Sequence, residues 1–292
     1  MTTTTVRKHP RRTSSGVTEV RRHERNVPVN AQRPQVPHPE SNQLTPEEHS
    51  LFREMQKESL WLDHDDFDVR NGSANQAVLE FEKFYSPWRE GLTWTQATAI
   101  QKYVASNSNS KRVNLASIGD PKWTNKQDPW IHWGASIDKA LRKAQSPPED
   151  TIVFRAWNKD KLSEFAPDAG KTYRNDAFMS TSYNSQASFF FGGTISDRRK
   201  AIMQIHIPPG TRGVAYLPGD MDSKHLEGHQ PTGYHLTFKK RESEFLLNRG
   251  MKLKKLGEYD YEQKIPTKTM GGEDGEPLIR PWHVHAFTVV NE

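Results

Sequence analysis

The order of helical and strand patterns constrains this chain more than any single motif does. Between residues 45 and 145, apolar side chains recur at helical spacing. From residue 151 onward, short apolar segments are separated by turn sequences such as Pro208-Pro209-Gly210. A parallel α/β sheet needs helices and strands to alternate, whereas a block of each is typical of an α+β domain. We therefore predict an α+β fold.

The same patterns predict the individual elements. Thr45 precedes Pro46 and two glutamates, which is the sequence of a capped helix start. We predict helices over 45–62, 75–85, 93–105 and 134–145. A further helix would follow a loop at 106–110 and end at residue 118. We predict strands over 151–157, 177–183, 200–207, 212–216, 242–248, 251–256 and 283–290.

Residues 1–44 are rich in Thr, Arg, Pro, Asn and Gln and lack apolar periodicity, so we predict that they are disordered. Within residues 1–40, eight basic and three acidic side chains leave an excess of five positive charges, which equals the formal net charge of the chain. The basic pI is therefore a property of the tail, and no nucleic-acid affinity of the folded part follows from it. Three roles stay open for the tail: a solvated extension, an arm for nucleic acid or another anionic surface, or a delivery signal.

Composition excludes several classes of site. The chain has no cysteine, so disulfides, thiolate nucleophiles and thiolate metal ligands are excluded. No apolar run approaches the length of a membrane span, and we expect none. The residues after Met1 lack the apolar core of a secretory signal peptide. If the protein is exported, we expect a specialised secretion machine or a carrier to do it.

Two carboxylates one residue apart stand at the start of a predicted strand, in Arg241-Glu242-Ser243-Glu244-Phe245. Alternate residues of a strand point to the same face, so Glu242 and Glu244 would project together. Two like charges on one face are unfavourable unless a cation, a substrate or a proton compensates them. A solvated strand edge is the structural alternative.

Two upstream strands add groups of complementary chemistry. Arg155 interrupts the apolar run from Thr151 to Trp157, and a buried guanidinium needs anionic partners such as phosphate or carboxylate. Ser180, Thr181 and Ser182 form a run of three hydroxyls that can pin neighbouring strands or orient a carboxylate. Either segment alone is a weak signal.

Taken in order, Phe154-Arg155, Phe178-Met179-Ser180-Thr181-Ser182 and Glu242-Ser243-Glu244 resemble the motifs of the Arg-Ser-Glu class of mono-ADP-ribosyltransferases. That family includes bacterial toxins and effectors as well as vertebrate ecto-enzymes. The resemblance covers about residues 88–292, which would form the catalytic domain, preceded by a helical extension over 45–87. It implies two β-sheets packed roughly at right angles around an NAD-binding cleft with flanking helices.

The resemblance also implies a role for each motif residue. Glu244 would be the catalytic carboxylate that bonds the ribose 2′-hydroxyl of NAD⁺, and Ser180 would orient it. Arg155 would clamp the phosphates, and the backbone of Ala156 would meet the nicotinamide amide. Thr181 and Ser182 would tie their strand to its neighbour. Phe191, or else Phe189 or Phe190, would stack on nicotinamide. Tyr103 and Asn114 match NAD-binding residues of the family only weakly.

Glu242 would select the acceptor. In this class a glutamate at that position goes with arginine, and a carboxylate can both hold a guanidinium and take its proton. The resemblance thus implies ADP-ribose transfer from NAD⁺ to an arginine of a target protein. An NAD⁺ glycohydrolase and an inactive binding module of the same fold remain alternatives.

The remaining expectations concern setting and metals. We expect a monomer that is exported as a bacterial effector or toxin and acts in the cytoplasm of a target cell; a cytoplasmic or phage-delivered protein is the alternative. His283 and His285 alternate on one predicted strand, as metal ligands do, but the sequence shows no third ligand. We therefore interpret both histidines as structural and expect no metal.

Overall fold

In the computed structural model, the described residues are 11–13, 16–18, 43–58, 76–105, 107–123, 129–183, 185, 188, 200–217, 244–268 and 274–291. The chain divides into two compact units, Met1–Ser41 and Asn42–Glu292. In the first unit, β1 (Arg11–Thr13) pairs antiparallel with β2 (Gly16–Thr18), a hairpin that the sequence does not predict. Residues 43 and 44 of the predicted tail are also described, and its other residues lie outside the described residues.

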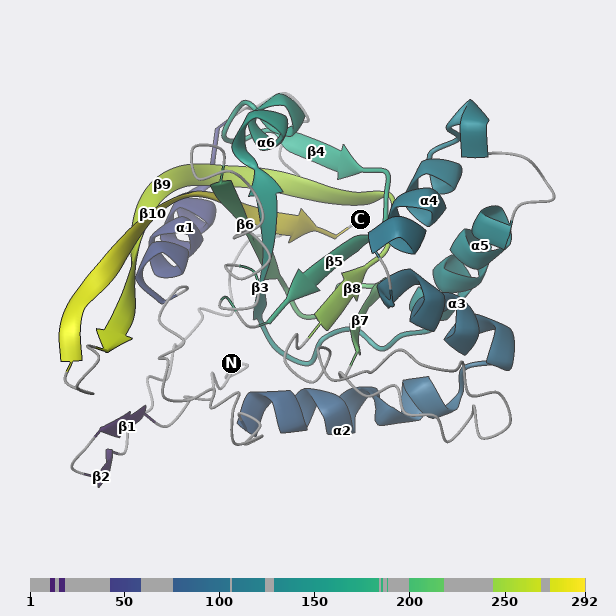
Figure 1. Ribbon diagram of the computed structural model, residues 1–292, viewed down its shortest axis with the longest axis horizontal. Coiled ribbons are helices and arrows are strands. Elements are labelled where there is room, and N and C mark those ends of the chain that lie inside the picture. Colours follow the sequence, from purple (N-terminus) through teal and green to yellow (C-terminus); the bar gives the residue numbers. More distant parts are fainter. Residues whose placement is uncertain are drawn as a thin grey trace, which may run out of the picture. The chain divides into compact units, whose positions relative to one another are not determined.

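The second unit begins with a block of helices (Figure 1). The α-helices are α1 (Pro46–Glu58), α2 (Gln76–Glu90), α3 (Trp94–Val104), α4 (Asn107–Ser117) and α5 (Pro129–Leu141), followed by the short α6 (Lys159–Phe165) after the first strand of the sheet; a 3-10 turn spans Pro121–Trp123. A helix is present in each of the five predicted regions, but some bounds were wrong: α4 begins at Asn107, inside the loop predicted over 106–110, α2 continues to Glu90, and α5 spans Pro129–Leu141 where 134–145 was predicted. Thr45 caps α1, since its Oγ1 accepts a hydrogen bond from the Glu48 backbone at 3.2 Å.

Eight strands follow: β3 (Thr151–Asn158), β4 (Thr172–Asn175), β5 (Met179–Ser182), β6 (Lys200–Ile207), β7 (Val214–Leu217), β8 (Glu244–Leu247), β9 (Met251–Lys268) and β10 (Asp274–Val290). They form one mixed sheet in the order β4-β9-β10-β6-β3-β5-β8-β7. Only β10 and β6 run parallel; the other neighbours are antiparallel. A block of helices followed by this sheet confirms the α+β class.

The sheet has two halves joined at one point, which we call the seam. The pairing between β3 and β5 consists of the single residue pair Phe154 and Ser182, whereas β3 and β6 pair over eight residues. One half is therefore β4-β9-β10-β6-β3 and the other is β5-β8-β7, and the two halves differ in direction in Figure 1. The two sheets implied by the resemblance are connected here through this one pair.

Some elements are longer than predicted or were not predicted. The strands predicted at 251–256 and 283–290 are the ends of a long hairpin, β9–β10, which continues to residues 268 and 274 as a curved ribbon (Figure 1). Within it, residues 258–262 alternate acids with tyrosines, so this stretch lacks the apolar run that marks a buried strand. The strand β4 and the seven-residue α6 are too short for a periodic signal.

The helices before residue 88 belong to the same core as the sheet. On α2, the Phe81 ring packs edge-on against Phe245 of β8, with 5.0 Å between centroids. On α1, Met55 is fully buried, and its carbonyl accepts a hydrogen bond from Gln204 of β6 at 3.1 Å. The domain boundary predicted between residues 87 and 88 thus falls inside α2, within one compact unit.

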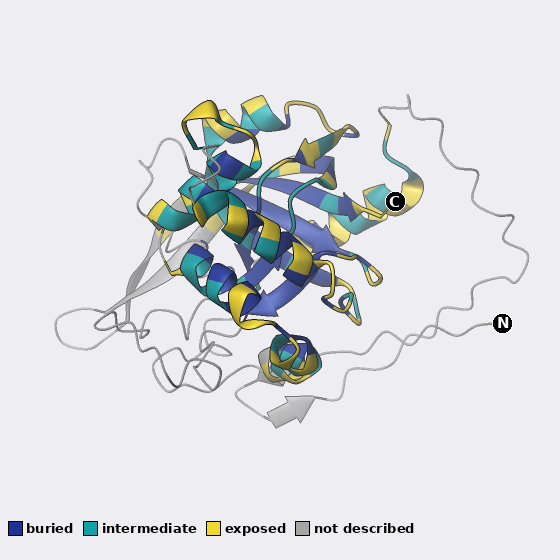
Figure 2. Ribbon diagram, turned by 90° about the vertical axis from the view of Figure 1, so that its right-hand side faces the viewer, coloured by how far each residue is buried: buried dark blue, intermediate teal, exposed yellow. Residues whose placement is uncertain are grey.

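Burial follows the expected division between strands and helices. In Figure 2 the strands at the centre are mostly buried, while the helices around them have buried and exposed faces. Of the helices that the structure describes, none is long and apolar enough to cross a membrane.

Candidate active site

The three sequence motifs meet at the seam. Phe154 of β3 pairs with Ser182 of β5, and Ser182 pairs with Glu244 of β8. Arg155 follows Phe154 directly, so the guanidinium, the hydroxyls and the carboxylate come from three neighbouring strands. Glu242 and Phe191, with Phe189 and Phe190, lie outside the described residues.

The Arg155 guanidinium crosses the seam. Its Nη1 donates a hydrogen bond to the backbone carbonyl of Ser180 at 2.6 Å, and its carbon Cζ lies 5.5 Å from the ring centre of Trp157. Burial lowers the pKa of Arg155, while Tyr103 and Glu244 raise it. These opposing effects require that the Glu244 carboxylate lies within electrostatic range of the guanidinium.

Tyr103 and Asn114 fix the entrance to β5 from the helical side. The Tyr103 hydroxyl donates to the carbonyl of Phe178 at 3.1 Å. The Asn114 side chain binds both backbone groups of Phe178: Nδ2 donates to its carbonyl at 3.2 Å, and Oδ1 accepts from its N–H at 3.0 Å. Asn114 Nδ2 also donates to the Tyr103 hydroxyl at 3.2 Å. Two residues that the resemblance matched only weakly therefore hold the strand that carries Ser180.

The Tyr103 phenol belongs to the same electrostatic group. Burial raises its pKa, and the nearby Arg155 opposes that shift. Glu244 lies close enough to raise the pKa of Tyr103 further. A buried phenol, a half-buried guanidinium and a half-buried carboxylate thus share one small region of the seam.

The three hydroxyls divide between the two faces of β5. Ser180 and Ser182 are two residues apart and share a face, whereas Thr181 points to the other. Thr181 Oγ1 donates to the carbonyl of Phe245 at 2.8 Å, which ties β5 to β8. Ser182 lies directly opposite Glu244, while Ser180 lies opposite Leu246. Both serines are on the face of Glu244, and the orienting role implied for Ser180 remains a prediction.

A family comparison agrees with this geometry. The model of the ADP-ribosyltransferase exoenzyme family matches residues 81–268, which is more than half of the chain and includes all three motifs. The chain belongs to the ADP-ribosyltransferase exoenzyme family. The resemblance stated from the three motifs is thereby confirmed.

Solved structures of three toxins are similar to this chain at low identity. The ADP-ribosylating toxin BECa of a binary enterotoxin of C. perfringens is 20% identical, with a TM-score of 0.46 over 76% of this chain and 48% of that one. C3larvin toxin from Paenibacillus larvae is 18% identical, with a TM-score of 0.46 over 72% of this chain and 94% of that one. The C2-I component of the Clostridium botulinum C2-toxin is 19% identical, with a TM-score of 0.48 over 72% of this chain and 47% of that one.

The chain spans about half the length of BECa and of C2-I. Among curated proteins, none matches the sequence.

Ala156 has a packing that suits a backbone role in this family member. Its side chain packs against the cluster of Phe154, Ile202, Trp282 and Val284. As its neighbour in the strand, Arg155 points to the opposite face. A ligand on the face of Arg155 would therefore meet the backbone of Ala156 and not its methyl group.

One structural support of the exoenzyme site was missed by sequence reasoning. Arg249, after β8, donates from Nε to Asp138 of α5 at 2.7 Å and from Nη1 to the Ser117 carbonyl at 3.0 Å. Its guanidinium also lies over the ring of Phe178, 5.8 Å from the centroid. Asp138 lies within the helix predicted over 134–145, and no local pattern links it to a residue 111 positions later.

Proposed function

We propose that the protein transfers ADP-ribose from NAD⁺ to an arginine side chain of a target protein and releases nicotinamide. One observation carries the proposal: Arg155, the serines of β5 and Glu244 converge at a single point of a family domain. The guanidinium there complements the phosphates of a dinucleotide, and the carboxylate complements the positive charge that develops on the ribose as the glycosidic bond breaks.

Glu244 acts on the ribose. When the bond between the ribose C1′ and the nicotinamide nitrogen breaks, nicotinamide leaves with the electron pair and the ribose becomes an oxocarbenium ion. A carboxylate fixed beside that ribose stabilises the developing positive charge. The position of Glu244 opposite Ser182 supports this role, because a neighbouring hydroxyl can hold the carboxylate in one orientation.

Arg155 acts on the pyrophosphate. Its Nη1 is fixed by the Ser180 carbonyl, and the other donors of the guanidinium fork can bind phosphate oxygens. The pKa of Arg155 is lowered by burial, yet arginine keeps its charge in proteins. A partly buried cation of this kind has a strong requirement for an anionic partner, which the phosphates of NAD⁺ would supply.

Glu242 selects the acceptor in this proposal. It would hold the guanidinium of the target arginine and accept the proton that is lost when the guanidinium nitrogen bonds to C1′. The Glu-x-Glu spacing supports this role, because residues two apart in an extended segment would project to the same face. The acceptor is thus an arginine and not water.

We further propose that the protein acts as a bacterial toxin or effector on a host or target cell. Membership of an exoenzyme family supports this setting. A monomer would suffice, since the three motifs of the site come from one chain. The basic residues 1–40 would then serve delivery or target binding and take no part in the chemistry.

The test is incubation of the full chain with NAD⁺ labelled in the adenylate part and a eukaryotic or bacterial lysate. Label on protein, located at arginine by mass spectrometry, is the expected result. Free ADP-ribose without labelled protein would mean a glycohydrolase, and no turnover would mean a binding module; either outcome refutes the proposal.

Glu242→Gln separates the two carboxylates. The variant is expected to lose transfer to protein, or to agmatine as a small guanidine acceptor, by about 100-fold while most NAD⁺ hydrolysis remains. Parallel loss of both activities would show that Glu242 does not act on the acceptor. The readout is release of nicotinamide measured beside labelled agmatine.

A further inference from the structure

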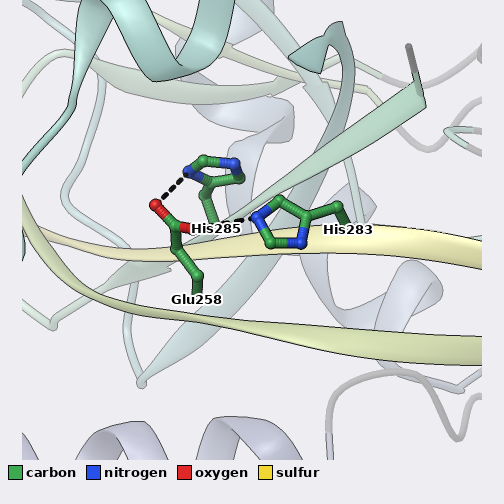
Figure 3. A group of neighbouring side chains, drawn as sticks. All are labelled: Glu258, His283 and His285. Atoms are coloured by element: carbon green, nitrogen blue, oxygen red, sulfur yellow. Dashed lines mark hydrogen bonds and ion pairs between the residues drawn. The ribbon is translucent and has the colours of Figure 1, made fainter. Parts of the chain in front are cut away.

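The β9–β10 hairpin carries a second group of chemically active side chains, outside the seam. His283 and His285 lie on β10, and Glu258 lies on β9 (Figure 3). The register pairs His285 with Glu258 and His283 with Asp260. The sequence shows two histidines that share a face, and pairing of the strands adds the third ligand that the sequence lacks. We call Glu258, His283 and His285 the β9–β10 cluster.

The ligand atoms of the cluster converge. Glu258 Oε2 lies 2.9 Å from His283 Nε2, and Glu258 Oε1 lies 3.4 Å from His285 Nδ1. One ligand atom from each of the three residues lies within 4.8 Å of the others. The two imidazole rings are nearly perpendicular, with 84° between their planes, so their nitrogens approach the carboxylate from different directions (Figure 3).

His283 already has the hydrogen bond that a metal-bound histidine needs. Its Nδ1 lies 2.9 Å from Oδ1 of Asp260, while its Nε2 faces Glu258. Histidines that bind metals nearly always donate their second ring N–H to a carboxylate or carbonyl, which fixes the ring and its tautomer. Asp260 would supply this contact from the exposed side of the hairpin.

His285 supplies an independent sign of a missing ligand. Its side chain is fully buried, and neither ring nitrogen has a hydrogen-bond partner. Buried polar groups in proteins are nearly always satisfied, so such an imidazole needs an explanation.

We propose that Glu258, His283 and His285 form a binding site for one divalent transition-metal ion, with Zn²⁺ the ion that best fits the ligands. Two imidazoles and one carboxylate are a common zinc set, and the fourth position would be taken by water. Glu258 is exposed and His283 is only partly buried, so an ion can enter from solvent. The absence of thiolate ligands excludes a closed structural site of the cysteine type.

Lys255 provides the competing explanation of the cluster. Its buried ammonium donates to the carbonyls of Ala166 at 2.6 Å and Pro167 at 3.3 Å, and it also contacts Glu258 Oε1. A closed ion-pair network of Lys255 and Glu258 would need no metal. That network satisfies Oε1 of Glu258 but leaves both ring nitrogens of His285 without a hydrogen-bond partner, and this difference favours the metal.

The cluster is close to the seam but distinct from it. Arg155 pairs with Met203 on β6, and Met203 pairs with His285 on β10. His285 is thus two strands away from Arg155, a distance of roughly 10 Å. The ion would bind whether or not the proposed transfer reaction takes place, so the two proposals can fail separately.

Equilibrium dialysis of the full chain, free of added histidines, against Zn²⁺ tests the site. We expect one ion per chain whose binding is at least tenfold weaker in Glu258→Gln and in His283→Gln. Both side chains are at least partly exposed, so circular dichroism should show that these variants fold. Asp260→Asn should weaken binding by about tenfold, as loss of an orienting carboxylate usually does.

His206→Gln is the matched control. His206 is also a strand histidine beside a carboxylate, but its ring nitrogens contact Thr288 and Asp150 at 2.9 Å. Its variant should bind Zn²⁺ as the unaltered chain does. With Co²⁺ as a second probe, visible d–d absorption should appear in the unaltered chain and vanish in His283→Gln. Absence of binding, or binding that both cluster variants retain, overturns the proposal.

Discussion

The seam and the β9–β10 cluster both contain charged side chains of one sheet, but these side chains have different kinds of partners. At the seam, polar side chains donate to main-chain carbonyls: Arg155 to Ser180, Tyr103 to Phe178 and Thr181 to Phe245. In the cluster, side chains contact one another, and the buried His285 has no hydrogen-bond partner. Main-chain contacts fix a shape for a large anionic ligand, whereas an unsatisfied imidazole is suited to a small cation.

Of the substitutions at the seam, Glu244→Gln should reduce activity most. Loss of the negative charge beside the oxocarbenium ion is expected to reduce both transfer and NAD⁺ hydrolysis by about 1,000-fold. Rates of nicotinamide release check this, with Glu262→Gln as the control, since Glu262 is an exposed strand glutamate of β9. Zn²⁺ binding should be retained in Glu244→Gln, and its loss would mean that the two regions are one site.

Arg155→Lys should have the next largest effect. Lysine keeps the charge but loses the planar fork that binds the Ser180 carbonyl and, in our proposal, phosphate as well, so kcat/KM for NAD⁺ should fall by about 100-fold. Direct titration of NAD⁺ separates binding from chemistry. Unchanged affinity for NAD⁺ in this variant would contradict the phosphate-binding role.

Asn114→Ala tests how far the seam depends on main-chain anchoring. The variant loses the hydrogen bonds to Phe178 and Tyr103, and we expect about 2 kcal/mol less free energy of unfolding. Chemical denaturation measures the difference. Asn109→Ala, on the same helix, removes a single bond to the Lys102 carbonyl and should cost about 1 kcal/mol or less. Equal losses would show that the contacts to Phe178 have no special weight.

Thr181→Val should have the smallest effect. It removes the hydrogen bond to the buried Phe245 carbonyl, so the free energy of unfolding should fall by about 1 kcal/mol. Thr98→Val is the same substitution at a buried hydroxyl without a hydrogen-bond partner, and it should be neutral or slightly stabilising. A reversed order in thermal denaturation would refute the role of Thr181 as a tie between β5 and β8.

The sequence predicted the residues of the seam better than it predicted their arrangement. Arg155, Ser180 and Glu244 were predicted because their three motifs, taken in order, resemble those of a known family, although each segment alone is a weak signal. The single pair that joins Phe154 to Ser182 has no local signature, since register depends on packing on both sides. The register places Ser182 opposite Glu244 and Ser180 opposite Leu246, and the orienting role that the resemblance implies for Ser180 stays a prediction.

The β9–β10 cluster was only half predictable. His283 and His285 share a face by alternation alone, which needs no knowledge of the neighbouring strand. Glu258 joins them through the register of a long hairpin, and this register shifts between Ala286 and Phe287. An irregularity of that kind changes which residues face each other and cannot be read from periodicity.

The single pair at the seam has a consequence for how the protein sets its geometry. A single residue pair can hold the two halves of the sheet together, but it cannot set the angle between them. That angle must come from the side chains wedged behind β8, where Phe81 and Tyr85 of α2 press on Phe245, and from the Arg249 brace to α5. The helical layer therefore sets the distance between the Arg155 guanidinium and the Glu244 carboxylate. Substitutions of Phe81 or Tyr85 would change this distance while every polar group of the site stays the same.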